Sequence, residues 1–225
     1  MAHITIIGGH GKVTLLAHPL LVAAGHTVTA LIRNPDQAAD VQAAGANPVV
    51  ADIQSLSTQQ ITDLLTEYST DVLVWSAGAG GGNPERTYAV DRDAAIRSMD
   101  AAVAAGVKRY IMVSYMGASS DHGVDPNNSF YAYAEAKAAA DEHLRASSMD
   151  WTLLGPGMLT DGEAGDISVE VVTDGNRDVP RATVAAVLVA AIGDDSTIGK
   201  ALPFHAGSTA IRRAVAEAPA VTSLA

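Results

Sequence analysis

Residues 3–14 read HITIIGGHGKVT, an apolar run followed directly by glycines at three of the next four positions. The run His3–Ile7 is rich in β-branched side chains, as in a buried strand. Across Lys12–Ala24 the apolar residues recur at helical spacing, although Pro19 predicts a kink or an early stop. A strand, a glycine-rich turn and a helix in this order are typical of the first unit of a dinucleotide-binding α/β domain.

The turn has the spacing Gly8-x-x-Gly11-x-x-Thr14, whereas the nucleotide-binding fingerprint carries Gly or Ala in the last position. Glycines let the main chain approach a phosphate closely. The free N–H groups at the positive end of the helix dipole then hold a pyrophosphate. A plain tight turn is the alternative, but the place of this turn in the chain favours a cofactor. We expect the cofactor to contact Gly8, His10, Gly11, Lys12 and Val13.

Outward from this turn, short apolar runs alternate with helical patterns. Strands are expected at 27–32, 48–51, 71–75, 109–114, 151–154, 167–172 and 201–205, and helices at 35–44, 58–68, 84–105, 130–148, 181–192 and 209–217. Strands that are apolar on both faces pair in parallel, with helices covering both sides of the sheet. The sequence predicts an α/β fold: one domain, residues 1–217, with a Rossmann-like doubly wound parallel sheet and a small C-terminal substrate lobe at 157–217. The tail 218–225 is expected to be loose.

Composition excludes several classes of protein. The 225 residues carry 14 Lys+Arg against 25 Asp+Glu, a net charge of −11, so nucleic acid and anionic membranes are not expected partners. There is no cysteine, and the seven histidines show no paired metal-ligand spacing, so no metal site is predicted. No apolar run reaches the roughly 18–20 residues of a membrane span. We expect a cytoplasmic protein that acts on a small molecule as a monomer or homodimer.

The residues after the second strand indicate which dinucleotide would bind. An acidic residue there would bind the ribose 2′-hydroxyl of NAD, but this chain has Arg33 followed by Asn34. A guanidinium suits a 2′-phosphate, and Lys12 could add charge from the glycine turn. We therefore expect NADP (NADPH) in preference to NAD, with contacts from Arg33 and Asn34. The alternative is that Arg33 is a solvated loop cation.

Two further segments could flank the cofactor. After the third strand, the Asp52 carboxylate could accept a hydrogen bond from the adenine amine while Ile53 packs on the ring; an aspartate that caps a turn is the alternative. After the fourth strand, the loop Ser76–Asn83 is rich in glycine. Its low bulk suits a backbone that lies along a cofactor, but a flexible surface loop would look the same. The expected contacts are Ala77, Gly78 and Ala79.

Six segments follow one another in an order that carries a family resemblance: GGHGKV, LIRNP, SAGAG, VKRYIMVSYMGA, YAEAK and LLGPGMLTD. Together, across residues 3–215, they resemble the atypical short-chain dehydrogenase/reductases, a compact NAD(P)-binding group often labelled sugar epimerases. The resemblance implies a single-domain Rossmann fold and a bound nicotinamide dinucleotide. It does not imply one substrate, because the group includes flavin and biliverdin reductases, isomerases and NADP-binding redox sensors. The chain departs from the group's pattern at Thr14, Tyr115, Gly155 and Thr183.

The resemblance also implies a catalytic set of Ser114, Tyr133 and Lys137. Tyr133 and Lys137 are four residues apart and share a helix face. A nearby lysine and the cofactor's positive ring would lower the pKa of the phenol, which could then exchange a proton with a substrate oxygen. Lys137 would also bind the ribose, and Ser114 would hold the substrate carbonyl. Pro156 and Met158 would lie beside the nicotinamide. The alternative is that the Tyr-x-x-x-Lys spacing is fortuitous.

Three functions are compatible with these residues. The first is an NADP-dependent oxidoreductase that transfers hydride to or from a small carbonyl, quinone or flavin-like substrate. The second is a non-catalytic NADP-binding sensor that controls a partner. The third is an NAD(P)-dependent sugar epimerase or isomerase that retains its cofactor. We expect the first, an enzyme.

Overall fold

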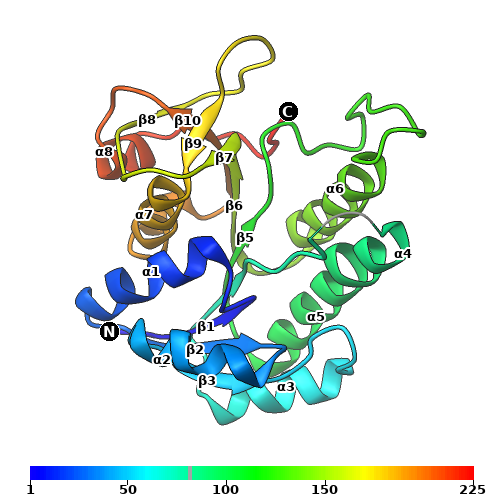
Figure 1. Ribbon diagram of the computed structural model, residues 1–225, viewed down its shortest axis with the longest axis vertical. Coiled ribbons are helices and arrows are strands. Elements are labelled where there is room, and N and C mark those ends of the chain that lie inside the picture. Colours follow the sequence, from blue (N-terminus) through cyan, green and yellow to red (C-terminus); the bar gives the residue numbers. More distant parts are fainter. Residues whose placement is uncertain (81–82) are drawn as a thin grey trace.

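The computed structural model describes residues 1–80 and 83–225, and within them eight strands lie side by side in the order β3-β2-β1-β4-β5-β6-β10-β8 (Figure 1). These strands are β1 (His3–Ile7), β2 (Thr27–Ile32), β3 (Asn47–Val50), β4 (Val72–Trp75), β5 (Arg109–Val113), β6 (Asp150–Pro156), β8 (Ile167–Val169) and β10 (Lys200–Ala206). Neighbouring strands are parallel except β8, which pairs antiparallel with β10. A separate parallel pair consists of β7 (Met158–Thr160) and β9 (Asp178–Pro180).

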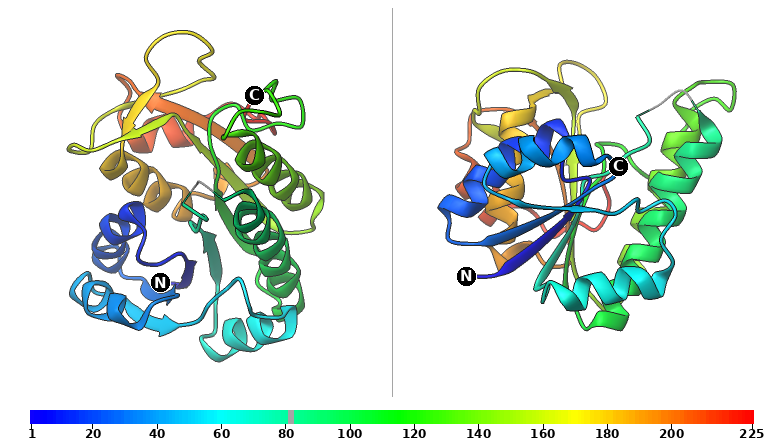
Figure 2. Two further views of the ribbon diagram at one scale, coloured as in Figure 1. Left: turned by 45° about the vertical axis from the view of Figure 1, so that its right-hand side comes forward. Right: turned by 60° about the horizontal axis from the view of Figure 1, so that its bottom comes forward.

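Helices cover both faces of this sheet (Figure 2). They are α1 (Lys12–Ala23), α2 (Ala38–Ala43), α3 (Thr58–Glu67), α4 (Pro84–Thr87), α5 (Ala95–Ala105), α6 (Tyr131–Ala146), α7 (Arg181–Ile192) and α8 (Ile211–Ala216). Two 3-10 turns, η1 (Pro35–Gln37) and η3 (Asp195–Thr197), and a π-helical segment, η2 (Tyr88–Ala94), complete the helical elements of the described residues. One apolar core lies between the sheet and α1 with α7, and a second lies between the sheet and α3, α5 and α6.

The predicted doubly wound fold is confirmed. The central strands β1, β4 and β5 are buried along nearly their whole length, as expected of parallel strands covered on both faces. Strand order reverses between β1, from which the chain runs outward to β3, and β4, from which it continues in the other direction. Ligands of open α/β sheets bind at this reversal, beyond the carboxyl ends of the strands. The glycine turn that follows β1 stands at this position.

Helical structure differs from the prediction in two places. The early stop predicted at Pro19 is absent, because α1 continues through this exposed residue to Ala23. The helix predicted for residues 84–105 is interrupted by the π-helical segment η2. Asp91 lies in that segment, fully buried, and one of its carboxylate oxygens accepts a hydrogen bond from the backbone of Ala79. Hydrophobic periodicity carries no signal for such a widened turn.

Strands β7 and β9 were not predicted, because each has three residues and lies in a segment read as loop. The loose tail expected at 218–225 is also wrong. The Leu224 side chain is fully buried, its carbonyl accepts a hydrogen bond from the Gly117 N–H, and the Val221 carbonyl accepts one from Ala201. A Cβ at Gly155 would overlap the Leu224 side chain. Gly155, a departure from the family pattern, therefore makes room for the tail.

Candidate functional site

The first two glycines of the turn are required by close packing. Gly8 has a φ of 87°, and a Cβ built on it would lie 2.6 Å from the Ala77 nitrogen. A Cβ on Gly9 would lie 2.5 Å from the Ala30 Cβ on β2. The glycines thus bring the turn against the start of the loop after β4 and leave a backbone surface without side chains. This surface fits a pyrophosphate, which needs close approach to the main chain.

Thr14 ties the turn to the start of α1. Its side chain is fully buried, and its Oγ1 lies 3.0 Å from the Gly8 carbonyl oxygen and 2.9 Å from that of Gly11, so its proton is shared between them. No side chain caps α1 at Gly11, which leaves the first N–H groups of the helix for a ligand. Thr14 replaces the small residue of the fingerprint with a hydroxyl that holds the turn in shape.

His18 supports the same turn from within α1. Its Nε2 lies 2.6 Å from the Gly9 carbonyl oxygen, so this nitrogen carries the proton and donates it. Its Nδ1 is buried without a partner. Burial lowers the pKa of His18 from its ordinary value of 6.5, and the bond to Gly9 opposes this effect. The ring is therefore neutral. No pattern in the sequence pointed to this residue.

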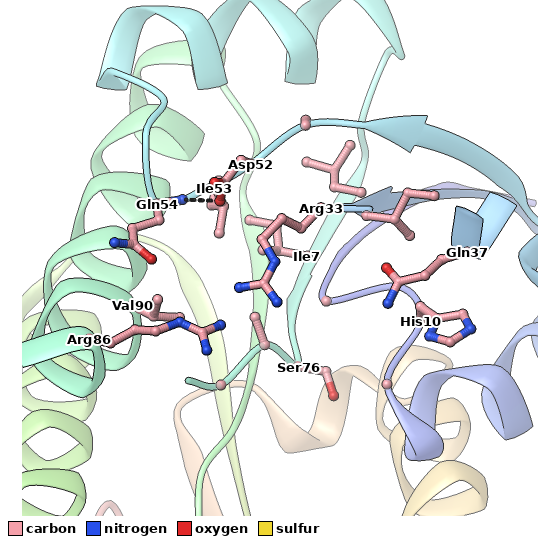
Figure 3. A pocket seen from close by; sticks show the side chains of 17 residues that line it. Ile7, His10, Arg33, Gln37, Asp52, Ile53, Gln54, Ser76, Arg86 and Val90 are labelled. Carbon is pink, nitrogen blue, oxygen red and sulfur yellow. Dashed lines mark hydrogen bonds between the residues drawn. The ribbon is translucent and has the colours of Figure 1, made fainter. Parts of the chain in front are cut away.

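The first cavity, of about 240 Å³, lies beyond the ends of β1, β2 and β3. Eight predicted cofactor contacts line it: Gly8, His10, Gly11, Arg33, Asp52, Ile53, Ala77 and Gly78. Figure 3 shows Arg33, from the end of β2, and Arg86, from α4, pointing toward one another across the cavity. In the described part of the chain neither guanidinium forms an ion pair with a carboxylate. The cavity therefore offers two guanidinium groups beside a single carboxylate, Asp52.

Arg86 was missed by the sequence reasoning, since it belongs to no motif and reaches the cavity only through the fold. Lys12, expected to assist Arg33, lines a different cavity. Asn34, a predicted contact, is absent from the lining and uses its side chain to cap η1 by accepting from the Asp36 N–H at 3.1 Å. The second cation beside Arg33 is thus Arg86.

The second cavity, of about 360 Å³, continues from the first, because Gly11, Ser76, Ala77 and Gly78 line both. Five other predicted residues line it: Lys12, Val13, Ser114, Tyr133 and Pro156. The glycine turn therefore stands between two cavities, as a pyrophosphate would stand between two nucleosides. Of the predicted loop Ser76–Asn83, residues 81 and 82 lie outside the described residues.

Ser114 is not free to act as an isolated hydroxyl. Its Oγ lies 2.5 Å from Oδ2 of Asp141, one helical turn beyond Lys137 on α6. Asp141 is fully buried and its Oδ1 has no partner. Burial raises the pKa of this carboxyl group, and Lys137 and Ser114 act in the opposite direction. The sequence reasoning missed Asp141, although its spacing of four from Lys137 places both on one helix face.

Lys137 is 1% exposed and lines neither the first nor the second cavity. Its Nζ donates to the Val113 carbonyl oxygen and to Met112 Sδ, each at 3.0 Å. Burial lowers the pKa of Lys137, an effect that Asp141 and Asp91 oppose. The structure shows the Lys137 ammonium bound to strand β5, so the predicted ribose contact stays a prediction.

The prediction that Lys137 and the cofactor's positive ring together lower the pKa of Tyr133 stays a prediction. Burial raises the pKa of the Tyr133 phenol, and the nearby Asp91 and Asp141 raise it further. Burial likewise raises the pKa of Tyr115 to about 12, with Asp141 contributing. Both phenols lie on the second cavity and hold their protons at neutral pH.

Asp91 connects η2 to the loop after β4. Its Oδ2 accepts from the Ala79 N–H at 3.0 Å, and its Oδ1 is buried without a partner. Burial raises the pKa of this carboxyl group, while the Ala79 bond and the cations Lys137 and Arg86 lower it. The backbone N–H of Ala79, a predicted cofactor contact, is therefore already hydrogen-bonded within the protein.

A third cavity, of about 400 Å³, shares Tyr115, Pro156 and Gly157 with the second. Met158, expected beside the nicotinamide, lines this third cavity and is 60% exposed. The rings of Tyr115, Phe130 and Tyr133 pack together with centroids 5.2–5.6 Å apart. The cavity thus adds an apolar, aromatic compartment beyond the proposed catalytic residues.

The strand order and the glycine turn between two cavities define a nucleotide-binding Rossmann protein. Residues 8–195 match a family described as NAD(P)H-binding, and the chain belongs to this family. Within residues 1–80 and 83–225 no group of three His, Asp or Glu side chains is arranged to hold a metal ion. In the same residues no helix is long and apolar enough to cross a membrane.

Three proteins of this kind are similar to the chain over most of its length. A UPF0659 protein of Schizosaccharomyces pombe is 31% identical over 96% of this chain and 94% of its own length. YhfK of Bacillus subtilis, labelled an uncharacterised sugar epimerase, is 32% identical over 84% of this chain and 87% of its own. A solved structure from Bacillus halodurans, described as a candidate NAD-dependent epimerase/dehydratase, superposes with a TM-score of 0.86 at 30% identity and covers 96% of this chain and 99% of that one.

Proposed function

We propose that the protein is an NADP-dependent oxidoreductase that transfers hydride to or from a small carbonyl, quinone or flavin-like substrate. The observation that carries this proposal is the position of the glycine turn between two continuous cavities, lined by Gly11, Ser76, Ala77 and Gly78 on both sides. The first cavity suits the adenosine end of a dinucleotide, and the second suits the nicotinamide end with a substrate.

The two arginines of the first cavity support NADP over NAD. A 2′-phosphate brings close to two negative charges, and a guanidinium binds phosphate through two parallel hydrogen bonds. Arg33 and Arg86 face one carboxylate in the described lining, Asp52, whose Oδ1 already accepts from the Gln54 N–H. Two cations against one acid favour the phosphorylated ribose.

The residues of the second cavity would serve hydride transfer in distinct ways. When bound, the nicotinamide ring supplies or accepts the hydride. Pro156, Tyr115 and Val13 line this cavity and would shield the ring from water. Ser114 and the protonated Tyr133 phenol are among the groups of this cavity that can donate a hydrogen bond to a substrate oxygen, and the raised pKa of Tyr133 favours a donor over a base.

Cofactor titration followed by a substrate panel tests the proposal. Purified protein is titrated with NADPH and NADH and then offered quinones, flavins, aldehydes and ketones. We expect NADPH to bind more tightly and at least one acceptor to be reduced. Equal affinity for the two cofactors would contradict the role of the arginines. An unchanged turnover in Tyr133→Phe would exclude Tyr133 as the proton donor.

A second candidate is a cofactor-binding sensor without catalysis, and one observation favours it. The Lys137 ammonium is bound to strand β5 and the Tyr133 phenol is not activated, so the implied Tyr–Lys pair lacks its base. This function predicts tight NADPH binding and no turnover on any acceptor. An epimerase, as the labels of two similar proteins suggest, predicts cofactor that stays bound through purification.

A further inference from the structure

Asp141 and Ser114 form a hydrogen bond that joins a fully buried carboxyl group to the wall of the second cavity. Ser114 lies at the carboxyl end of β5 and lines that cavity, while Asp141 lies behind it on α6. The Ser114 Oγ and Asp141 Oδ2 lie 2.5 Å apart: the hydroxyl donates to an ionised carboxylate, whereas a protonated Asp141 donates to Ser114 and leaves the Ser114 proton for the cavity. The hydroxyl is thus a bridge between the buried acid and the cavity.

The surroundings of Asp141 favour its protonated form. An ionised carboxylate needs hydrogen bonds at both oxygens, but Oδ1 is buried without a partner. On its own helix Lys137, Tyr133 and Arg145 face it; β5 contributes the Tyr110 phenol, and Tyr115 follows β5. The π-helical segment contributes a second buried acid, Asp91, which shares the charge of Lys137. The single buried ammonium of Lys137 therefore has to balance the charges of two buried carboxyl groups, Asp91 and Asp141.

We propose that Asp141 is a proton reservoir for the second cavity, which holds a proton in the resting protein and delivers it through the Ser114 hydroxyl to the substrate oxygen. The proposal rests on the proposed function and names the proton donor of its reaction. Ser114 would touch the substrate, and Asp141 would act through Ser114 as a positioning residue. Tyr133 then needs no activated form.

The transfer balances in atoms and charge. In the reduction of a carbonyl, the hydride forms the new C–H bond and the C=O π bond becomes a lone pair on oxygen. The Ser114 O–H proton passes to that oxygen, and the Asp141 O–H proton passes to Ser114. The alcohol leaves, Asp141 remains as a carboxylate beside Lys137, and a proton from solvent restores it. The oxidised cofactor, which carries a positive ring, is the state in which the carboxylate is stabilised.

Proton release on cofactor binding tests this idea without any substrate. The full-length protein is titrated at pH 7.5 with NADP⁺ and with NADPH, in two buffers of different ionisation enthalpy, by calorimetry. Both cofactors carry the same 2′-phosphate, so the difference between them isolates the ring charge. We expect NADP⁺ to release up to one proton more per protein than NADPH. The binding itself, seen in the same titration, reports separately on the proposed function.

Variants identify the source of the proton. Asp141→Asn should abolish the difference, whereas Glu142→Gln, at the exposed neighbouring acid on α6, should retain it. No difference in the native protein, or a difference that survives Asp141→Asn, would overturn the proposal while leaving cofactor binding intact. Because Asp141→Asn could fail to fold, infrared spectra of the native protein provide a second measurement. A protonated carboxyl band should be present, should be lost on NADP⁺ binding, and should shift in Ser114→Ala; its absence would refute the reservoir.

Discussion

At the scale of single residues, the first cavity shows how charge is concentrated in an acidic chain. The protein carries a net charge of −11, yet Arg33 and Arg86 meet in one cavity without forming an ion pair within the described residues. Like charges that converge repel one another, and a bound anion would offset this repulsion. The arrangement suits a phosphate better than a hydroxyl.

Substitution of these arginines should change cofactor preference. Hydrogen bonds to a charged group contribute about 1.5–3 kcal/mol each, or roughly 10- to 100-fold in affinity. Arg33→Ala and Arg86→Ala should each weaken adenosine 2′,5′-bisphosphate by about that factor and leave adenosine 5′-monophosphate nearly unchanged. Arg92→Ala is the matched control, because Arg92 pairs with Asp93 outside the cavity. Equal weakening of both ligands by Arg86→Ala would indicate stacking on adenine instead.

Thr14 should contribute to both stability and binding. Thr14→Val keeps the volume of the buried side chain but removes the hydroxyl shared between the Gly8 and Gly11 carbonyls. We expect a loss of about 1–3 kcal/mol in the free energy of unfolding, measured with urea, and weaker NADPH binding. Thr14→Ser, which retains the hydroxyl, should lose much less. A fully stable Thr14→Val protein would show that the glycines alone fix the turn.

The sequence predicts those site residues that belong to a local motif. The glycine turn, Arg33 and the pair Asp52-Ile53 follow strand ends, so their place at one sheet edge follows from the fold class. Arg86, Asp91 and Asp141 have no such signal, because they reach the site through the packing of helices against loops far away in sequence. In the sequence alone, Asp91 and Asp141 look like ordinary surface charges of alanine-rich helices.

At the scale of elements, α1 acts as a support for the turn that precedes it. The His18 side chain on α1 donates a hydrogen bond to the Gly9 carbonyl oxygen in the preceding turn. Its other ring nitrogen, Nδ1, is buried without a hydrogen-bond partner. Protonation would place an unpaired N–H in the core. The position of the cofactor-binding turn is thus coupled to the charge of one histidine.

This coupling predicts a pH dependence of stability. Since burial lowers the pKa of His18, the unfolded chain binds more protons than the folded one once the pH falls below about 6.5. The stability contributed by neutral His18 is complete above that pH and is lost as the pH falls through the window beneath it. Urea unfolding between about pH 8 and pH 5 should show a weaker dependence in His18→Gln. An unchanged slope would indicate that other groups control acid sensitivity.

Element boundaries were predictable where apolar periodicity is strong, as in β1, β2 and α7. The π-helical turn η2 was not, because its cause is tertiary: it lies where Asp91 is buried against the loop after β4. The short strands β7 and β9 pair only with one another, so their formation depends on a contact between segments some 20 residues apart. The local sequence of either segment therefore does not predict the pairing of β7 with β9.

At the scale of the whole molecule, the tail ties the loop after β5 to the neighbouring strands β6 and β10. Residues 218–225 cross back to β6 and β10, where Leu224 fills the space left by the missing side chain of Gly155. A glycine and a leucine separated by most of the C-terminal region thus form one packing unit. Neither residue alone indicates this in the sequence, and the expected loose tail was wrong for that reason.

Leu224→Ala should therefore behave as a core substitution. We expect a loss of about 2–5 kcal/mol in the free energy of unfolding, measured with urea. Val221→Ala, at a side chain 39% exposed, is the control and should change stability little. Gly155→Ala should destabilise the protein by overlap with Leu224, and the double variant should be more stable than the sum of the single losses predicts. Strict additivity would mean that the two sites do not touch.

The packing of Leu224 also has a consequence for biosynthesis. Gly155 is translated 69 residues before Leu224, which at about 5–20 residues per second amounts to on the order of ten seconds. Throughout that interval the space above Gly155 on β6 lacks the Leu224 side chain that fills it in the folded protein. A nascent chain that has not yet reached Leu224 therefore lacks the side chain that packs over Gly155.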